Sequence, residues 1–478
     1  MSTLADRIRG IVRPPAASGN HLPLLPEPTG SSDLPDRFDP EPDATNPPDR
    51  RDSCAVPVLE RTLAGEWRDG CFVIEHRRAA SSRHGKEPIG HVAARLSETA
   101  DDAALFTNGS PARPPFLFLD LETTGLSGGA GTLAFLVGCG WFDDDGAFVT
   151  RQFLLTRFQD ERPLLARVAA ELESAGAMVS FNGKSFDAPL LETRFMFHRL
   201  EWVGARLPHV DILHPARRFW KAPVGGPNGH RYAPTAGDSA DTVGRLFRAA
   251  GPDSSSCSLQ TLERQIVGAR RNGDIPGFQI PGRYFQFVRS GDAAPLQTIL
   301  EHNRLDLLTL AALTARLLHL TRTGPDGARD AREVLALGHV YACAGLDDRA
   351  RAAFRHAAGR CRSPRGAFDV VRIEALRRLA LACRRACLFE EAADCWSELV
   401  EIRGCPPLVE REATAALAIH SEHRRRDLNA AKAFALRTLA IEPGPVWEAA
   451  ARHRLARLDR KITVQQSEAR SLKFEASD

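Results

Sequence analysis

The sequence predicts an α/β domain with a mixed sheet and flanking helices, followed by an all-α helical-repeat domain. The first prediction rests on short apolar runs of strand length that alternate with helical periodicity between residues 116 and 199. The second rests on the region after about residue 325, where strand signals end and a pattern of small and large residues recurs at helical spacing.

The composition is typical of a soluble globular protein. Hydrophobic residues make up 43% of the 478 residues and charged residues 26%, with a formal net charge of +3. No run of 18 apolar residues is present and the N-terminus lacks the apolar centre of a signal peptide, so we expect no membrane contact and a cytoplasmic location. The ten cysteines contain no Cys-x-x-Cys pair, which favours free thiols over disulfides or zinc.

Shifts in composition divide the chain into five expected parts. Stretches rich in Pro, Gly, Asp and Ser mark the tail and the insertion, because such segments bury too little apolar surface to fold. The parts are a disordered tail over 1–53, a lead-in segment over 54–110, the α/β domain over 111–325 with a flexible insertion at 222–256, helical repeats over 326–465 and a polar tail over 466–478.

Within the α/β domain, we expect three strands joined by short turns, then a helix and a further strand. Turn residues separate the apolar runs, and the helix shows apolar residues at helical spacing. Ser258 is a suitable N-cap for a later helix that Gly268 ends. The expected ranges are strands at 116–121, 132–141, 147–155 and 177–181, and helices at 161–175, 187–199, 259–267 and 295–323.

The first apolar run ends in two carboxylates, Asp120 and Glu122. Alternate residues of a strand point to the same face, so these two side chains project together. Two neighbouring like charges are unfavourable unless a cation lies between them, and oxygen ligands of this kind suit Mg²⁺ or Mn²⁺. The alternative is a strand that ends in a solvated acidic turn.

Three more polar residues lie where they can join this pair. Asp187 follows a short strand and begins a helix, which suits either a simple N-cap or an active-site position. His302 and Asp306 stand four residues apart in the long helix and therefore share one of its faces. A solvated His–Asp pair on the helix surface is the alternative for these two residues. Asn182 and Lys184, just before Asp187, are expected to contact substrate.

The helical region contains two copies of a small-and-large residue pattern and a weaker third copy. The pattern begins at Leu337 in the first copy and at Leu379 in the second, with equal offsets between corresponding residues. This spacing resembles that of tetratricopeptide repeats, whose helical hairpins stack to bury a shared core. A plain helical bundle is the alternative.

The ordered set of motifs resembles the DEDD superfamily of 3′–5′ exonucleases, which have a ribonuclease-H-like fold, and more narrowly its YprB-like branch. The predicted order of strands and helices is consistent with that fold. The resemblance covers roughly residues 60–325. The motifs that carry it are Asp-Leu-Glu-Thr-Thr-Gly at 120–125, Phe-Asn-Gly-Lys-Ser-Phe-Asp at 181–187, His-Val-Asp-Ile-Leu-His-Pro at 209–215, Ser-Leu-Gln-Thr-Leu-Glu at 258–263, Asp-Ile-Pro-Gly at 274–277 and His-Asn-Arg-Leu-Asp at 302–306.

The resemblance implies a site with two divalent metal ions, Mg²⁺ or Mn²⁺. Its implied metal ligands are Asp120, Glu122, Asp187 and Asp306, with His302 as the general base. One branch of the superfamily has Tyr four residues before the last Asp, and another has His five residues before it. This chain departs from both, because it has His at the Tyr spacing. We also expect Thr123, beside Glu122, to contact substrate.

Basic and aromatic residues near these motifs are candidates for holding a nucleic-acid strand by charge and stacking. For Phe186, packing in the core is the alternative that we favour. For the arginine clusters, the alternative is a solvated helix face. The candidates are Lys184, Phe186, Arg217, Arg218 and Trp220.

The sequence therefore predicts a metal-dependent nuclease, a 3′–5′ exonuclease that acts on single-stranded nucleic-acid ends by a two-metal mechanism. Its helical repeats would bind a protein partner. The alternative is a non-catalytic nucleic-acid-binding or scaffold protein that retains the exonuclease fold. A third hypothesis is that the helical repeats carry the main function and that the chain is mainly an adaptor.

Overall fold

A computed structural model describes residues 55–107, 109–125, 131–221, 257–361, 369–441 and 445–475. Two sequence predictions lie outside these residues. They are the disordered tail at 1–53 and the insertion at 222–256.

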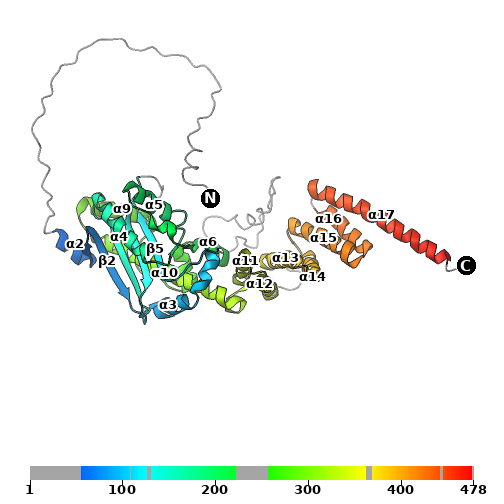
Figure 1. The fold of residues 1–478 in the computed structure, drawn as a ribbon, viewed down its shortest axis with the longest axis horizontal. Coiled ribbons are helices and arrows are strands. Elements are labelled where there is room, and N and C mark those ends of the chain that lie inside the picture. The colour runs from blue at the N-terminus through cyan, green and yellow to red at the C-terminus, as the bar shows by residue number, and fades with distance from the viewer. Residues whose placement is uncertain are drawn as a thin grey trace, which may run out of the picture. The chain divides into compact units, whose positions relative to one another are not determined.

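The centre of the fold is a mixed sheet of seven strands in the order β1-β2-β7-β6-β5-β8-β9 (Figure 1). The β5–β8 and β8–β9 pairs are parallel, and the other neighbours are antiparallel. The three-strand meander and the parallel fourth strand expected from the sequence are confirmed. The strands are β1 (Glu66–Arg68), β2 (Cys71–Arg78), β5 (Phe116–Thr123), β6 (Ala134–Phe142), β7 (Phe148–Leu154), β8 (Ala177–Ser180) and β9 (His209–Asp211).

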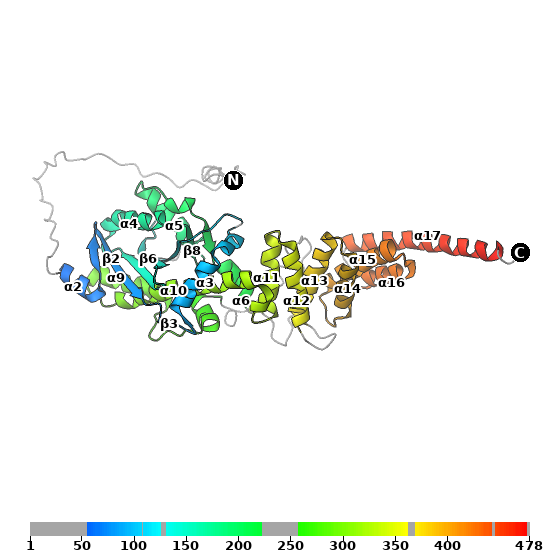
Figure 2. The same cartoon turned by 60° about the horizontal axis from the view of Figure 1, so that its bottom comes forward.

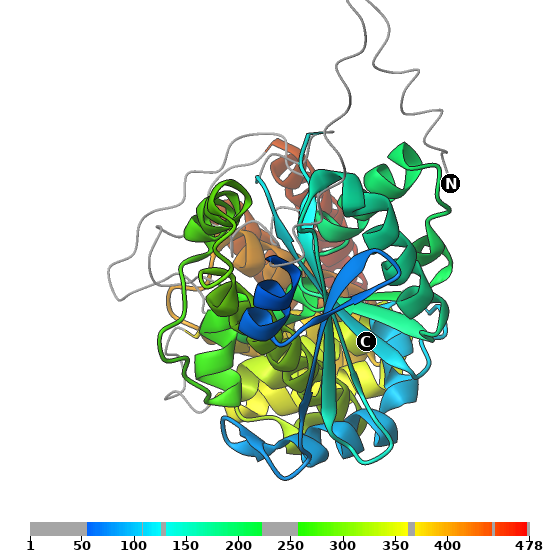
Figure 3. The same ribbon diagram turned by 90° about the vertical axis from the view of Figure 1, so that its left-hand side faces the viewer.

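Helices cover both faces of this sheet (Figure 3). Along β5, Phe116 and Phe118 belong to one apolar core and Leu117 and Leu119 to another, as strand alternation requires. The Phe face packs against α3 (Ile89–Glu98), α6 (Leu213–Trp220) and most of α10 (Leu296–Thr323). The Leu face packs against α4 (Glu161–Glu173), α5 (Asp187–Phe197) and α9 (Ile280–Ser290).

The segment before β5 contributes directly to the sheet. Strand β2 pairs along its full length with β7, and β1 extends the same edge. Helix α2 (Ala55–Leu63) precedes them, and a short hairpin of β3 (Arg83–His84) and β4 (Glu87–Pro88) leads into α3. The lead-in segment therefore supplies part of the α/β core as well as a covering helix.

The predicted N-cap at Ser258 is confirmed, because its hydroxyl accepts a hydrogen bond from the backbone N of Thr261. Helix α8 (Leu259–Leu262) is a single α-helical turn, and a π-helical turn, η4 (Glu263–Val267), continues it. Gly268 ends the helix with φ +76°, a left-handed conformation that glycine adopts without steric cost.

After α10 the structure is helical, and consecutive helices pack on one another (Figure 2). Gly338 explains one of the small residues in the repeated pattern, since a Cβ there would lie 2.4 Å from the Phe354 ring. This architecture is consistent with the predicted helical repeats. The helices are α11 (Ala331–Cys343), α12 (Asp347–Arg360), α13 (Val370–Arg385), α14 (Phe389–Glu401), α15 (Pro407–His420), α16 (Leu428–Ala440) and α17 (Pro445–Glu475).

One apolar core continues from the sheet through α10 into these helices. At the junction, Trp220 of α6 is buried, and its Nε1 donates a hydrogen bond to Glu333 of α11 at 2.9 Å. Arg316 of α10 donates to the same carboxylate at 3.1 Å. Because Trp220 and Glu333 are buried, the α/β domain and the helices after it share part of one core.

Helix α17 extends into the stretch that the sequence marked as a polar tail, and it ends at Glu475. Across the described residues, no helix combines the length and apolar character needed to span a lipid bilayer.

Candidate active site

Asp120 and Glu122 lie near the end of β5, on the sheet face that α10 covers. They continue the alternation of Phe116 and Phe118, whose side chains pack against that helix. The pairing of β5 with β6 shifts register between Glu122 and Thr123. The two carboxylates therefore project together toward α10, as the alternation predicted.

Asn303 of α10 holds Asp120 in place. Its Nδ2 donates to Asp120 Oδ2 at 2.8 Å, and its Oδ1 accepts from Gln152 Nε2 at 2.8 Å. Asn303 is fully buried against β6 at Gly138, where a Cβ would lie only 2.1 Å from Asn303 Oδ1. Gly138 is the residue opposite Asp120 in the sheet, so the absent side chain makes room for the amide.

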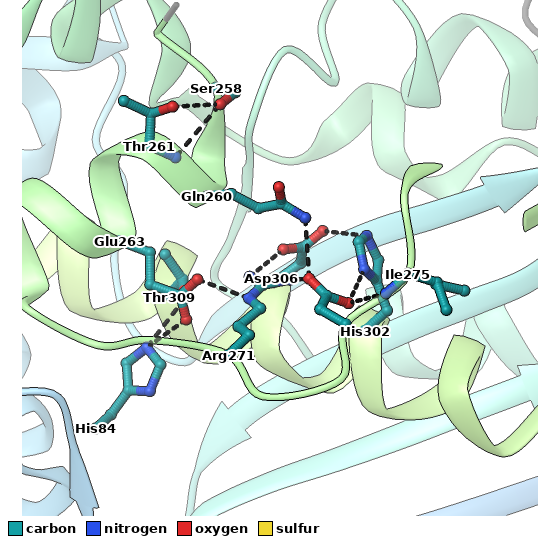
Figure 4. A network of polar contacts seen from close by, with 11 residues as sticks. His84, Ser258, Gln260, Thr261, Glu263, Arg271, Ile275, His302, Asp306 and Thr309 are labelled. Carbon is teal, nitrogen blue, oxygen red and sulfur yellow. Dashed lines mark hydrogen bonds and ion pairs between the residues drawn. The ribbon is translucent and has the colours of Figure 1, made fainter. Parts of the chain in front are cut away.

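Helix α10 also supplies His302 and Asp306, one turn apart on the same face (Figure 4). His302 Nε2 lies 3.4 Å from Asp306 Oδ2. Its other ring nitrogen, Nδ1, lies 2.6 Å from Oδ1 of Asp274, in the loop before α9. The imidazole is buried, and a carboxylate lies beside each of its two ring nitrogens. The alternative of a solvated surface pair is wrong.

Arg271 joins this group to a second buried acid, Glu263 of η4 (Figure 4). Its Nε donates to Glu263 at 2.6 Å, and its other nitrogens contact Asp274 and Asp306. Burial opposes the charge of Arg271, but Asp306 and Glu263 outweigh it and raise the pKa of the guanidinium. Arg271 therefore stays charged and offsets part of the negative charge of the cluster.

Asp187 begins α5 after a loop that Asp211 holds. Asp211, buried at the end of β9, accepts hydrogen bonds from the backbone N of Asn182 at 2.8 Å and of Lys184 at 3.1 Å. Asn182 has φ +70°, and a Cβ on Gly183 would lie 2.9 Å from Asp187 Oδ2. The neighbouring parallel strand thus fixes the position at which Asp187 enters the site.

Burial and neighbouring carboxylates raise the pKa values of three of these carboxyl groups. Burial, followed by the charges of Asp306, Glu122 and Asp187, raises the pKa of Asp120 well above its usual value. Burial and the charges of Asp306, Asp187 and Asp274 raise the pKa of Glu122 in the same way. Burial and the charge of Asp211 raise the pKa of Asp187 to about 7. Concentrated negative charge of this kind is relieved by a cation.

The donor chemistry fits a hard divalent cation, because all four predicted ligands are carboxylates. Asp306 retains coordinating capacity, since Arg271 binds its Oδ1 while Oδ2 faces His302 at a longer distance. Among the described residues, however, no group of three or more His, Cys, Asp or Glu side chains stands arranged as a metal site. The charge pattern therefore fits a cation, while the side chains do not already surround one point.

The predicted substrate contacts have local roles in this structure. The Thr123 hydroxyl donates to the Gly125 carbonyl at 2.9 Å, which holds the turn after β5. Asn182 supplies the left-handed residue of the loop before α5. Lys184 is exposed in the same loop, so its ammonium group is accessible to a ligand.

Two of the strand-holding candidates need correction. Core packing was the favoured role for Phe186, but its side chain is 56% exposed immediately before Asp187. Trp220 was a candidate for stacking, but it is 6% exposed and donates to Glu333 at the junction with the helical region. Arg217 and Arg218 are exposed on α6. Phe186 therefore places an exposed aromatic ring directly before Asp187.

Comparison with known proteins agrees with this architecture. Residues 117–318 match the family model of the RNase_H superfamily. Residues 117–318 form a ribonuclease H-like domain. The chain is also 27% identical over 379 residues to the Uncharacterized protein YprB of Bacillus subtilis (strain 168), which covers 77% of this chain and 80% of that protein.

A ribonuclease H-like domain supports a nuclease-type enzyme that binds nucleic acid. It also agrees with the position of Asp120 and Glu122 on a central strand of the sheet. The carboxylate cluster described above lies within the matched residues, whereas the helices from α11 onward lie beyond them.

Four residues of this candidate site were assigned no role from the sequence: Asp211, Arg271, Asp274 and Asn303. Asp211 and Asp274 lay within recognised motifs, and Asn303 lay beside His302, so position alone could have marked them. Arg271 carried no such signal. Its role follows only from the fold, which places its guanidinium between Glu263 and Asp306.

Proposed function

We propose that the chain is a metal-dependent nuclease that degrades single-stranded nucleic acid from its 3′ end. The observation that carries the proposal is the burial of Asp120 and Glu122 within electrostatic reach of Asp187 and Asp306: burial, and then the charges of those two carboxylates, raise the pKa values of Asp120 and Glu122. Burying like charges close together destabilises a fold, and carboxyl groups with strongly perturbed pKa values cluster at functional sites. We further propose that the helical region binds a protein partner.

The four carboxylates would hold two Mg²⁺ or Mn²⁺ ions. When bound, these ions supply Lewis-acid stabilisation of charge on the scissile phosphate and its leaving oxygen. The chain's own residues place the ligands. Asn303 orients Asp120, and the loop tied to Asp211 sets the start of α5, where Asp187 lies.

His302 is placed to accept the proton of the attacking water. Burial opposes ionisation of Asp274, but its hydrogen bond with His302 and the charge of Arg271 hold its pKa below the usual value. An ionised Asp274 accepts a hydrogen bond from Nδ1–H at 2.6 Å, and this favours the neutral tautomer whose lone pair is on Nε2, the nitrogen 3.4 Å from Asp306. Asp274 thus acts as a positioning residue that selects the imidazole tautomer.

The loop before α5 is suited to hold the end of a strand. Lys184 offers an exposed charge for a phosphate, and Phe186 offers an exposed ring on which a base can stack. Both residues lie within three positions of Asp187. A strand held there would present its terminal phosphodiester to the carboxylates.

The decisive test is a cleavage time course on 5′-labelled single-stranded DNA and RNA with Mn²⁺, Mg²⁺ or chelator. We expect a metal-dependent ladder that shortens from the 3′ end, and its absence in Asp120→Asn. Glu301→Gln is the control, because Glu301 is a partly exposed carboxylate of α10, next to His302 but outside the proposed ligand set. Cleavage by Asp120→Asn at the parental rate, or cleavage in chelator, would refute the proposal.

The role of Asp274 has a separate test. Asp274→Asn keeps the shape of the side chain but no longer favours a proton on Nδ1, so kcat should fall about tenfold or more while KM for the strand is unchanged. His302→Asn should lose as much activity, and the double variant no more than either single one. A loss confined to KM would exclude the positioning role.

A second candidate function is a non-catalytic nucleic-acid-binding protein. The observation that favours it is the ion pair between Arg271 and Asp306, which already neutralises one proposed metal ligand. This candidate predicts strand binding without turnover, and no stabilisation of the fold by Mg²⁺ or Mn²⁺ in thermal unfolding. The nuclease proposal predicts the reverse for both measurements.

A further inference from the structure

The far end of the helical region contains a positively charged cavity. It has a volume of about 570 Å³ and lies where η7 (Ser421–Arg425) and the start of α16 face α17. Besides Glu422 and His423, its lining combines three cationic side chains with two apolar ones and an amide: Arg426, Arg460, Lys461, Leu428, Val464 and Gln465.

The one carboxylate that lines this cavity, Glu422, already forms ion pairs with three basic side chains. Glu422 has a fully buried side chain, and it binds Arg454 at 2.9 Å, Arg457 at 2.6 Å and Lys461 at 2.9 Å. Three cations surround a single negative charge, so Glu422 does not neutralise the remaining arginines of the cavity.

Arg426 and Arg460 have no carboxylate partner within the part of the chain that the structure describes. Arg460 donates only to the backbone carbonyl of Ala456. Many other arginines of the helical region pair with acids on neighbouring helices. Examples are Arg355 with Glu391, Arg372 with Glu398, Arg377 with Glu412 and Arg437 with Glu410. Within the described residues, the cavity therefore brings together two arginines that lack the carboxylate partners of these examples.

The backbone at Arg426 adds an independent observation. Arg426 ends the π-helical turn η7 with φ +56°, a left-handed conformation that residues other than Gly, Asn and Asp rarely adopt. Glycine would fit this position without strain.

We propose that this cavity binds the phosphates of single-stranded nucleic acid, at a second site on the helical region. Guanidinium groups match phosphate oxygens in geometry and charge, and Leu428 and Val464 offer apolar surface to a sugar or base. The choice of nucleic acid rests on the proposed nuclease function, whereas the anionic character of the ligand does not.

Such a site would help to hold long substrates. A strand that contacts both the cavity and the carboxylate cluster dissociates more slowly than one held at a single site, because the second contact is intramolecular. Short substrates reach one site only and gain nothing. The cavity should therefore affect binding of long strands and leave cleavage of short ones unchanged.

The test is fluorescence anisotropy with the full chain in chelator, using labelled single strands of roughly 10 and roughly 40 nucleotides at about 50 to 200 mM salt. We expect Arg426→Glu/Arg460→Glu to weaken binding of the long strand about tenfold and to reduce its salt dependence. The matched control is Arg384→Glu/Arg385→Glu, which makes the same change of charge at exposed positions in the last turn of α13. The control should stay within about threefold of the parent chain.

Arg426→Gly separates loss of binding from loss of fold. It removes one cation and also relieves the left-handed strain, so affinity should fall while thermal stability is unchanged or higher. Equal binding by the cavity variant and the control would overturn the proposal. So would a parent chain that binds vesicles containing phosphatidylserine but no single strand.

The outcome does not depend on the nuclease proposal, because no cleavage occurs in chelator. Variant-sensitive binding by a chain that never cleaves would support the cavity and refute the nuclease. If the chain cleaves strands but the cavity variants bind them as well as the parent chain does, the nuclease proposal is supported and the cavity proposal is refuted.

Discussion

Gly138→Ala should damage the candidate site without touching any of its charged residues. The new Cβ would lie 2.1 Å from Asn303 Oδ1, whereas ordinary contacts begin near 3.4 Å, so the amide must retreat by about 1.3 Å. Asn303 is fully buried and bonds both Asp120 and Gln152, and it has no space in which to find new partners. Two lost hydrogen bonds between buried groups correspond to about 2–4 kcal/mol of unfolding free energy.

The same displacement should cost activity. Asp120 would lose the donor that orients its carboxylate, and a ligand misplaced by about 1 Å lowers the rate by about 10²-fold. The assays are urea unfolding and the initial rate of strand cleavage. Gly282→Ala is the control, because a Cβ at Gly282 meets nothing within 4 Å, and alanine in helix α9 should be neutral or slightly stabilising.

A double-mutant cycle isolates the cause. In an Asn303→Ala background the clash is gone, so Gly138→Ala should cost little further stability or activity. The coupling energy between the two positions should reach about 1–3 kcal/mol. Two outcomes would refute the argument that the missing Cβ of Gly138 leaves space for the Asn303 amide. One is additive losses of stability and activity in the double variant, and the other is a Gly138→Ala variant as active and stable as the parent chain.

Metal, stacking and pH each give a further prediction. Mg²⁺ or Mn²⁺ at about 100 times its dissociation constant should raise the unfolding free energy by about 2.7 kcal/mol, and calorimetry on Glu122→Gln should show no such gain. Phe186→Ala should raise KM for strands severalfold, whereas Phe197→Ala, which removes a 69% exposed ring from the end of α5, should not. Burial opposes the charge of Glu422, but hydrogen bonds from Arg457 and Lys461 outweigh it and lower its pKa from 4.5 to about 2. Its stabilisation is therefore complete above pH 4.5 and lost as the pH falls toward 2, and urea unfolding of Glu422→Gln at pH 7 should show a loss of about 3 kcal/mol. Equal acid sensitivity of parent and variant would contradict this account.

Local patterns in the sequence were sufficient for the order of elements and for one side of the site. The strand period placed Asp120 and Glu122 on a common face, and the helix period did the same for His302 and Asp306. The cap at Ser258 was likewise local, since its hydroxyl binds a backbone group three residues away. Such features depend on neighbours in sequence, so a single chain reveals them.

Exposure could not be read from the chain. Phe186 and Trp220 are both aromatic and both lie beside basic residues, yet one is exposed and the other is buried against Glu333. The difference arises because α6 packs on α11, a contact between segments more than a hundred residues apart in the sequence. No local period encodes such packing.

The chain by itself thus determined the four candidate carboxylates, their three supporting elements β5, α5 and α10, and the boundary between mixed and helical structure. Only the tertiary structure decided that Asp274 holds His302, that Arg271 binds Asp306 and that Gly138 admits Asn303. The reason is physical. Backbone periodicity sets the direction of a side chain, whereas its partner, burial and pKa depend on which distant segments the folded core brings against it.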